Sequence, residues 1–149
     1  MGRRNMRTIK FRAWDKITNQ MFRVKSITFN STTGEIQEVI SDEDFGALKT
    51  GQNDGDFERD RKYVELMQFT GLQDSKGVDI YDSDLIQWNG DGAIVEVVWN
   101  EKRACYYAGN IKHLTIPEAN RWEVVGNRWE NPDLLEKGAI NDHKPKHTT

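Results

Sequence analysis

The stretch Tyr63–Ile86, YVELMQFTGLQDSKGVDIYDSDLI, contains the most informative pattern of the chain. Short apolar runs alternate there with three groups of turn-forming residues: Thr70-Gly71, Ser75-Lys76-Gly77 and Asp82-Ser83-Asp84. Glycine favours turns because it accepts positive φ, and aspartate because its side chain accepts hydrogen bonds from nearby backbone N–H groups. The stretch therefore predicts short β-strands joined by tight turns.

The same stretch contains four aspartates, which allow two interpretations. They are Asp74, Asp79, Asp82 and Asp84. Their spacing lacks the alternating ligands and closing glutamate of an EF-hand loop, so a metal-binding or acid–base role is the less favoured alternative. An Asp-x-x-Gly pattern is typical of a turn whose side chain binds its own backbone. We therefore favour a structural turn motif, which comprises Gly71, Asp74, Gly77, Tyr81 and Asp84.

The composition indicates a soluble protein. Charged residues make up 30% of the 149, and the mean hydropathy is -0.79. No run approaches the roughly 20 apolar residues that span a bilayer. The N-terminal residues MGRRNMRTIK lack the apolar segment of a secretory signal. Cys105 is the single cysteine, which excludes an internal disulfide and fits the reducing cytoplasm, where we expect the protein to reside.

The segment 42–60 concentrates negative charge. It contains seven acidic and two basic residues, a local balance of -5, whereas the whole chain has a net charge of -3. Its three glycines and few apolar residues are typical of a solvated loop. We expect 42–60 to be a flexible linker between an N-terminal lobe (6–41) and a C-terminal lobe (61–138), which a disordered tail (139–149) follows.

Both lobes are predicted to be mostly β. In the first lobe, alternation over Thr8–Trp14, followed by Met21–Phe29 and Ile36–Ile40, predicts a small antiparallel meander. The second lobe contains about five short apolar runs, with a strong hairpin signal at Asn89-Gly90-Asp91-Gly92. Runs this short and closely spaced predict a small β-barrel.

One short C-terminal helix is expected to accompany this barrel. Asn131 is a good N-cap residue, and Pro132 is favoured at the first helical position. Gly138 would end the helix, and Leu134 and Leu135 would pack against the barrel. The predicted fold is therefore mostly β with minor α.

Residues suited to catalysis are scarce. His143 and His147 lie in the tail, so only His113 falls within a lobe, next to Lys112 and without an obvious acidic partner nearby. Cys105 lies in a predicted strand, where a buried, inert thiol is the favoured interpretation. The sequence contains no phosphate-binding glycine loop, CxxC pair or HExxH motif. We therefore predict no enzyme, no cofactor and no metal.

The aromatic residues allow a binding surface. Five tryptophans occur in the chain, most of which we expect in the core. Lys10, Arg12 and Trp14 share one face of the first strand, which is therefore basic and aromatic. A β-barrel can bind single-stranded nucleic acid with such a face, or another partner. Further basic residues of the second lobe are Lys102, Arg103, Lys112, Arg121 and Arg128.

Three segments carry a resemblance to a known family. FRAWD (Phe11–Asp15), LMQFTGLQDSKGVDIYDSDLI (Leu66–Ile86) and VVGNRWENPDLL (Val124–Leu135) resemble the three blocks of the YopX family. These are small proteins of uncharacterised function from phages and prophages of low-GC Gram-positive bacteria. Family members usually have glycine where Ser83 stands. The resemblance implies a mostly β fold with an SH3-like C-terminal barrel, in the cytoplasm of a bacterial host, and it brings no catalytic residues.

Two functions from different classes follow. The favoured one is a phage- or prophage-encoded accessory protein that binds a phage or host protein as a non-enzymatic adaptor, with a homo-oligomer expected. The alternative is a weak nucleic-acid-binding barrel that uses Lys10, Arg12 and Trp14. A metal-dependent enzyme built on the aspartates is the third hypothesis.

Overall fold

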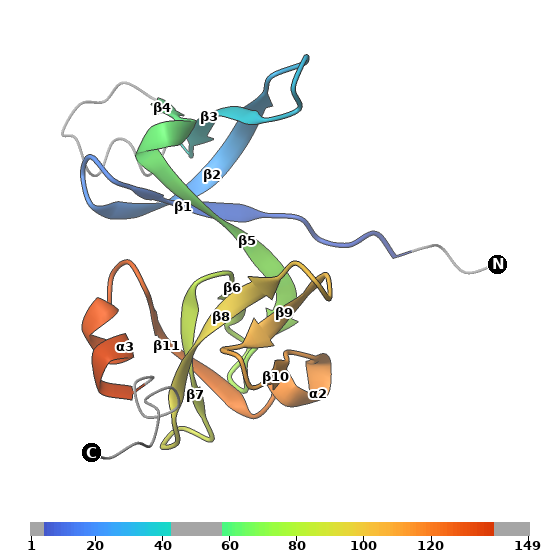
Figure 1. Cartoon of the computed structure of the whole chain (residues 1–149), viewed down its shortest axis with the longest axis vertical. Coiled ribbons are helices and arrows are strands. Elements are labelled where there is room, and N and C mark those ends of the chain that lie inside the picture. The colour runs from blue at the N-terminus through green and yellow to red at the C-terminus, as the bar shows by residue number, and fades with distance from the viewer. Residues whose placement is uncertain (1–4, 43–57, 139–149) are drawn as a thin grey trace. The chain divides into compact units, whose positions relative to one another are not determined.

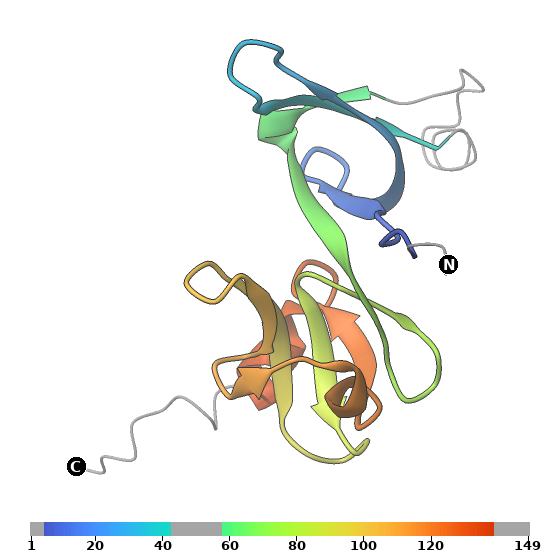
Figure 2. The same ribbon diagram turned by 90° about the vertical axis from the view of Figure 1, so that its right-hand side faces the viewer.

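The computed structural model describes residues 5–42 and 58–138, which form two compact units. The N-terminal unit is Lys10–Gln68, and the C-terminal unit comprises the described residues from Phe69 onward together with residues 5–9. Strand β5 (Val64–Gln73) contributes its first half to one unit and its second half to the other. Figures 1 and 2 show the strands of both units.

The N-terminal unit is an antiparallel sheet. Its elements are β1 (Phe11–Asp15), β2 (Gln20–Phe29), β3 (Ile36–Ser41), β4 (Glu58–Asp60), the 3-10 helix η1 (Arg61–Tyr63) and the first half of β5. The strand order is β4-β3-β2-β1-β5, and β6 pairs with the second half of β5. Alternation along β1 buries Ala13, which packs with Phe22, Val39 and Val64. The predicted antiparallel meander is confirmed.

The acidic segment differs from the sequence prediction at its end. Residues 43–57 of the predicted linker, like the predicted tail 139–149, lie outside the described residues. Glu58–Asp60, however, is not loop but strand β4, whose Glu58 pairs with Ile40 of β3. The open edge of β3 supplies backbone partners that charge composition alone does not reveal.

The C-terminal unit contains the remaining strands and both described α-helices. They are β6 (Asp79–Tyr81), β7 (Asp84–Trp88), β8 (Ile94–Asn100), β9 (Cys105–Ala108), β10 (Lys112–His113), α2 (Ile116–Ala119), β11 (Trp122–Asn127) and α3 (Pro132–Gly138). Helix α3 begins at Pro132 and ends at Gly138, as predicted. Asn131 accepts a hydrogen bond from the Asn127 N–H at 3.2 Å, so its side chain braces the turn before the helix. The prediction of a mostly β chain with one short C-terminal helix is confirmed.

The predicted small β-barrel is not a closed barrel within the described residues. The sheet order is β10-β9-β8-β7-β11, so β10 and β11 end the sheet and do not pair with each other in the part of the chain that the structure describes. Backbone groups of β11 instead bind the turn after β5. The Ser75 N–H donates to the Trp122 carbonyl at 3.0 Å, and the Val124 N–H donates to Asp74 Oδ2 at 2.9 Å. An SH3-like arrangement therefore stays a prediction.

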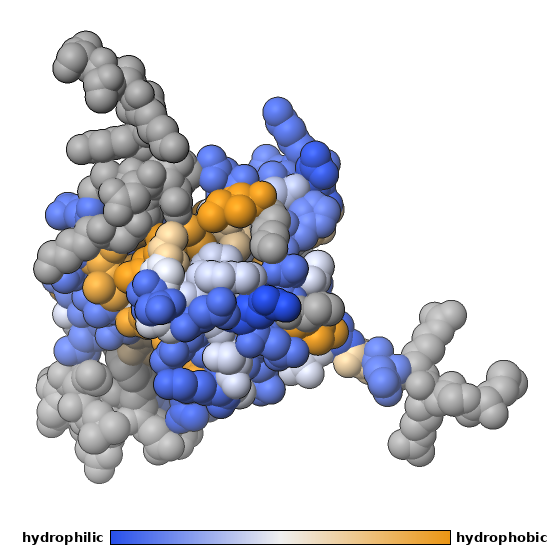
Figure 3. All heavy atoms as spheres, turned by 90° about the horizontal axis from the view of Figure 1, so that it is seen from below, coloured by the Kyte–Doolittle hydropathy of each residue, from blue (hydrophilic) through white to orange (hydrophobic). Residues whose placement is uncertain are grey.

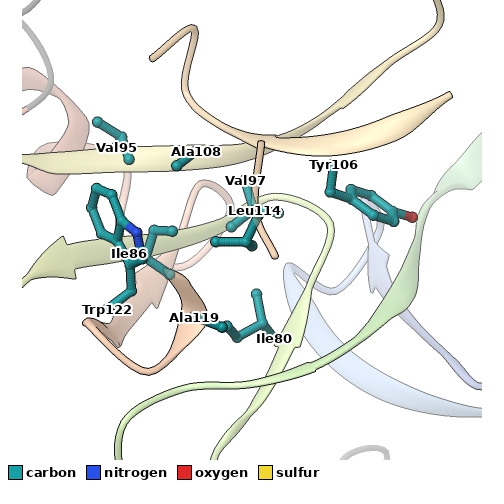
Figure 4. Packing of buried hydrophobic residues seen from close by; sticks show 9 residues of the cluster. All are labelled: Ile80, Ile86, Val95, Val97, Tyr106, Ala108, Leu114, Ala119 and Trp122. Carbon is teal, nitrogen blue, oxygen red and sulfur yellow. The ribbon is translucent and has the colours of Figure 1, made fainter. Parts of the chain in front are cut away.

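The core of the C-terminal unit lies on one face of this sheet. Figure 4 shows its nine buried residues, which are Ile80, Ile86, Val95, Val97, Tyr106, Ala108, Leu114, Ala119 and Trp122. Trp122 packs edge-on against Trp88, with ring centroids 5.1 Å apart. Trp99 lies at the margin of the same face and stays 46% exposed, so tryptophan is not uniformly a core residue here.

The surface is mostly polar (Figure 3), in agreement with the high fraction of charged residues in the sequence. The face drawn in Figure 3 is mostly hydrophilic, and hydrophobic side chains show only in limited areas. Within the described residues, neither α-helix has the length and apolar content needed to cross a bilayer.

Candidate functional site

The residues of the predicted turn motif bind backbone groups. Asp74 is 3% exposed, and its Oδ1 accepts hydrogen bonds from the N–H groups of Lys76 (2.8 Å) and Val78 (2.9 Å). Its Oδ2 accepts the bond from Val124 on β11. With three N–H donors, this carboxylate ties the β5–β6 turn to a strand 50 residues away.

Backbone geometry explains the other members of the motif. Gly71 and Gly77 have φ of 88° and 79°, where a Cβ is disfavoured. Asp84 is buried, and its Oδ2 accepts the Tyr81 N–H at 2.7 Å. Ser83 has φ of 68° although it is not glycine, so the left-handed turn persists with the substituted residue.

Burial and, to a lesser extent, the charge of Asp82 raise the pKa values of Glu96 and Tyr106. Burial raises the pKa of Glu96, the Arg128 guanidinium 3.1 Å away partly offsets this, and the charge of Asp82 raises it further. A raised carboxyl pKa accompanies many catalytic sites but also many structural ion pairs. In the part of the chain that the structure describes, no three His, Cys, Asp or Glu residues are grouped as metal ligands.

The predicted contact residues of the first strand lie on one sheet face. Lys10 precedes β1 and is exposed, whereas Arg12 and Trp14 are half-buried. The register places Arg12 directly opposite Arg23 on β2, which enlarges the basic character of this face. Arg23 forms an exposed ion pair with Asp42 at 3.1 Å, and the negative charge of Asp42 reduces the basic character of the face.

A buried ion pair in the N-terminal unit escaped sequence reasoning. Asp15 is fully buried and accepts two hydrogen bonds from Arg59, Nε at 3.0 Å and Nη2 at 3.1 Å. Burial alone raises the pKa of Asp15, but the bonds from Arg59, Thr18 and the Ile17 N–H outweigh burial and hold it below its ordinary value. The sequence places Arg59 in an acidic segment, which conceals its role.

The candidate binding site is a hollow on the outer face of β9 and β10. It has a volume of about 510 Å³ and is lined by Arg103, Tyr107, Ile111, His113, Thr115 and Glu118. The hollow is wide open to solvent and is closer to a flat surface than to an enclosed ligand cavity. We call it the β10 hollow. Figure 1 shows that β9, β10 and α2, which supply Tyr107, His113 and Glu118 of this lining, are neighbours in the C-terminal unit.

The strand register explains why these residues gather. His113 lies opposite Tyr107, and their rings meet edge-on with centroids 4.9 Å apart. Tyr106 and Leu114, one position along each strand, point to the core instead. The outer face is therefore left to Tyr107 and His113. Ile111 is 51% exposed beside them, and Ile116 of α2 is 70% exposed.

Most polar side chains of the β10 hollow make no side-chain hydrogen bond or ion pair within the described residues. No ion pair or side-chain hydrogen bond there engages the Arg103 guanidinium, the Tyr107 hydroxyl or the His113 ring. Thr115 occupies the N-cap position of α2, yet its hydroxyl makes no capping bond. Glu118 is half-buried and already interacts within the chain. These groups are therefore available to a ligand.

Sequence reasoning did not bring these residues together. Arg103 counted only as one of several basic residues, and His113 only as a histidine without a sequence-near acid. Tyr107, Ile111 and Thr115 carry no motif. The alternation of Tyr106 and Tyr107 across a hairpin was the one signal that could have placed an aromatic on the outer face.

Comparisons with known proteins place the fold. No curated protein matches the chain. Its structure is similar to that of protein EF1440 from Enterococcus faecalis, with a TM-score of 0.62 and 20% identity over 87% of this chain and 99% of that one. It is also similar to protein yopX from Bacillus subtilis, with a TM-score of 0.48 and 21% identity over 87% of this chain and 99% of that one. The family model described as YopX protein matches residues 10–136, and the chain therefore belongs to the YopX family.

Proposed function

We propose that this chain is a non-enzymatic accessory protein, encoded by a phage or prophage, that binds a protein partner through the β10 hollow in the host cytoplasm. The phage origin follows the family resemblance of the three sequence blocks. The single observation that carries the binding role is the group of unengaged side chains in the hollow, next to the exposed Ile111. Ile111 is the exposed aliphatic residue of this lining, and the aromatic rings of Tyr107 and His113 lie in the same lining.

The hollow suits binding better than catalysis. A nucleophile needs a base within hydrogen-bond reach, and Cys105 and His113 have no such contact within the described residues. Tyr107, His113 and Arg103 are instead residue types that are common at protein interfaces and hot spots, or that bind anions.

A pair of matched variants tests this function. The full chain with Ile111→Glu loses an apolar contact in the hollow, whereas Ile17→Glu alters a comparably exposed residue (56%) of the N-terminal unit. Both variants and the original chain serve as baits in nuclease-treated lysate of infected host cells. We expect a protein that the original chain and Ile17→Glu retain and Ile111→Glu loses.

Retention of the same proteins by all three baits contradicts the proposed site. Turnover of nucleotides or nucleic acid by the purified chain contradicts the non-enzymatic role. Light scattering on the chain alone identifies the case in which a second copy is the partner, because Ile111→Glu then lowers the measured mass.

The register of β1 and β2 favours one second candidate, the binding of single-stranded nucleic acid. Arg12 and Arg23 face each other across the strands, and Trp14 follows on the same face. A mobility-shift titration with oligo-dT at two salt concentrations tests it, since phosphate contacts weaken steeply with salt. Lys10→Ala plus Arg12→Ala should reduce binding, and no binding at low salt excludes this candidate.

A further inference from the structure

The backbone of His113 faces the open edge of the C-terminal sheet. The Leu114 N–H donates to the Tyr106 carbonyl at 2.9 Å, so these two residues form a hydrogen-bonded pair of the antiparallel ladder. Such pairs alternate with non-hydrogen-bonded pairs, and Tyr107 with His113 is therefore of the second kind. In that kind of pair the N–H and C=O groups point away from the partner strand. On β10 they point outward, because β10 ends the sheet.

An open edge beside a hollow fits an extended peptide segment. A segment that pairs with His113 adds a strand to the sheet and gains main-chain hydrogen bonds. Every second side chain of that segment then faces the outer side of the sheet, where the hollow lies. A partner segment would thus be recognised through side chains that stand two or four positions apart in its own sequence.

The hollow presents different chemistry at its two ends. Ile111, exposed and apolar, precedes β10, and Thr115 follows it. β10 runs antiparallel to β9, so Thr115 lies toward the end at which β9 leaves the turn that carries Arg103. Thr115 stands four positions after Ile111, and only Lys112–His113 between them are strand. A fully extended chain spans about 13 Å over four positions at 3.3 Å per residue.

The hollow is lined by one guanidinium and one carboxylate, those of Arg103 and Glu118. Glu118 interacts within the chain, although its Oε2 is buried without a hydrogen-bond partner, whereas the Arg103 guanidinium has no ion pair within the described residues. A guanidinium binds a carboxylate through two parallel hydrogen bonds, and a threonine hydroxyl can add a third. The end near Arg103 and Thr115 is therefore suited to an acidic side chain.

We propose that the β10 hollow binds an extended segment of a partner protein in which an apolar and an acidic residue stand four positions apart. The segment pairs with the outward backbone groups of His113. Its apolar side chain contacts Ile111 and Tyr107, and its carboxylate contacts Arg103. This assignment rests on the proposed protein-binding function and defines the chemistry of the partner.

Isomeric capped pentapeptides test the spacing. The full ¹⁵N-labelled chain is titrated with acetyl-Leu-Thr-Thr-Thr-Asp-amide and with its reverse, acetyl-Asp-Thr-Thr-Thr-Leu-amide, because the strand can add in either direction. The control acetyl-Leu-Thr-Thr-Asp-Thr-amide has the same composition but turns its carboxylate to the other side of the strand. We expect amide shifts around 103–118 at peptide concentrations up to about 10 mM, as suits millimolar affinity. One of the first two should bind about ten-fold more tightly than the control.

A charge-matched pair of variants tests the role of Arg103. Arg103→Gln should abolish the preference for the four-residue spacing, whereas Lys102→Gln, which removes the neighbouring exposed charge, should retain it. Equal affinity for all three peptides, absence of shifts around 103–118, or a preference that survives Arg103→Gln overturns the proposal. Shifts around 103–118 caused by oligo-dT and not by the peptides assign the hollow to nucleic acid and overturn it as well.

The two proposals fail separately. If Ile111→Glu loses a captured protein while the pentapeptides show no preference, the binding function stands and the motif is wrong. If the pentapeptides bind with the expected preference and no protein is lost with Ile111→Glu, the site chemistry stands and the accessory function is wrong.

Discussion

The turn around Asp74 and the β10 hollow lie in the same unit and use their polar side chains in opposite ways. Asp74 is buried, and both its oxygens accept bonds from backbone N–H groups. In the hollow, Arg103, His113 and Thr115 have no side-chain hydrogen bond within the described residues. The first arrangement stabilises the chain, and the second leaves hydrogen-bonding capacity for another molecule.

The contrast also separates the family signature from the candidate site. The three blocks that resemble the family, Phe11–Asp15, Leu66–Ile86 and Val124–Leu135, contain the buried Asp15, Asp74 and Asn127. The hollow is built from residues 103–118, which lie between the second and third blocks. A signature made of fold-stabilising turns identifies the family without indicating what its members bind.

Arg59→Ala is expected to have the largest effect on the free energy of unfolding. It tests the comparison in the N-terminal unit, where Asp15 is also a buried carboxylate. It leaves the buried Asp15 carboxylate without its cationic partner, which costs about 3 kcal/mol in the free energy of unfolding. Lys16→Ala is the control. It breaks an ion pair with Glu65 whose side chains are 44% and 34% exposed, and should cost about 0.5 kcal/mol or less. Urea denaturation measures both, and equal losses would show that burial does not decide the effect.

The pKa of Asp15 sharpens this prediction. Because the folded-state pKa is lowered, the charged carboxylate stabilises the fold above the unfolded pKa of about 3.9, and this contribution disappears as the pH falls through the folded pKa. The difference in stability between the original chain and Asp15→Asn should therefore be constant near neutral pH and shrink below about pH 4. A difference that grows in acid contradicts the assigned direction.

Asp74→Ala tests the turn directly. It removes the acceptor of three backbone N–H groups, which should cost about 2 to 3 kcal/mol, measured by urea denaturation. Asp91→Ala, at an exposed aspartate of the Asn-Gly-Asp-Gly turn, should cost about 0.5 kcal/mol or less. If Asp74→Ala left stability unchanged but weakened partner binding, the turn would belong to the binding site, and the contrast would be lost.

Ser83→Gly should stabilise the chain slightly. Ser83 adopts φ of 68°, and a residue without Cβ relieves about 1 kcal/mol of strain there, of which the greater freedom of the unfolded chain cancels a part. Ser75→Gly is the matched control, since Ser75 is not among the residues with positive φ and the change should be neutral or destabilising. Melting temperatures distinguish the two, and a lower value for Ser83→Gly would contradict the strain.

Arg103→Gln combined with Thr115→Ala should have the smallest effect on folding. Neither side chain is held within the described chain, so the free energy of unfolding should change by about 0.5 kcal/mol or less. The same variant should lose the peptide preference expected of the hollow. A large loss of stability would show that these side chains belong to the fold after all.

The sequence predicted those elements whose signals are local. Pro132 and Gly138 bound a helix because each acts on its own backbone, and the Asp-x-x-Gly pattern works within four residues. The meander of the N-terminal unit follows from alternation along single strands. Mostly β architecture was therefore within reach of sequence reasoning.

Features that join distant residues were not predictable in this way. The pairing of β4 with β3 and the ion pair between Asp15 and Arg59 connect the end of the acidic segment 42–60 with strands that precede it. The hydrogen bond from Val124 of β11 to Asp74 joins residues 50 positions apart. The hollow depends on the register of a two-residue strand, β10, which carries no periodic signal.

Strand β5 has a consequence for how the molecule comes apart. Val64–Gln68 pairs with β1 in one unit, whereas Phe69 and Gln73 pair with β6 in the other, so a single run of backbone is a structural member of both. A cut between Gln68 and Phe69 falls inside β5 and leaves each half of the strand with its own unit. A cut anywhere else within Val64–Gln73 removes part of β5 from one of the two units.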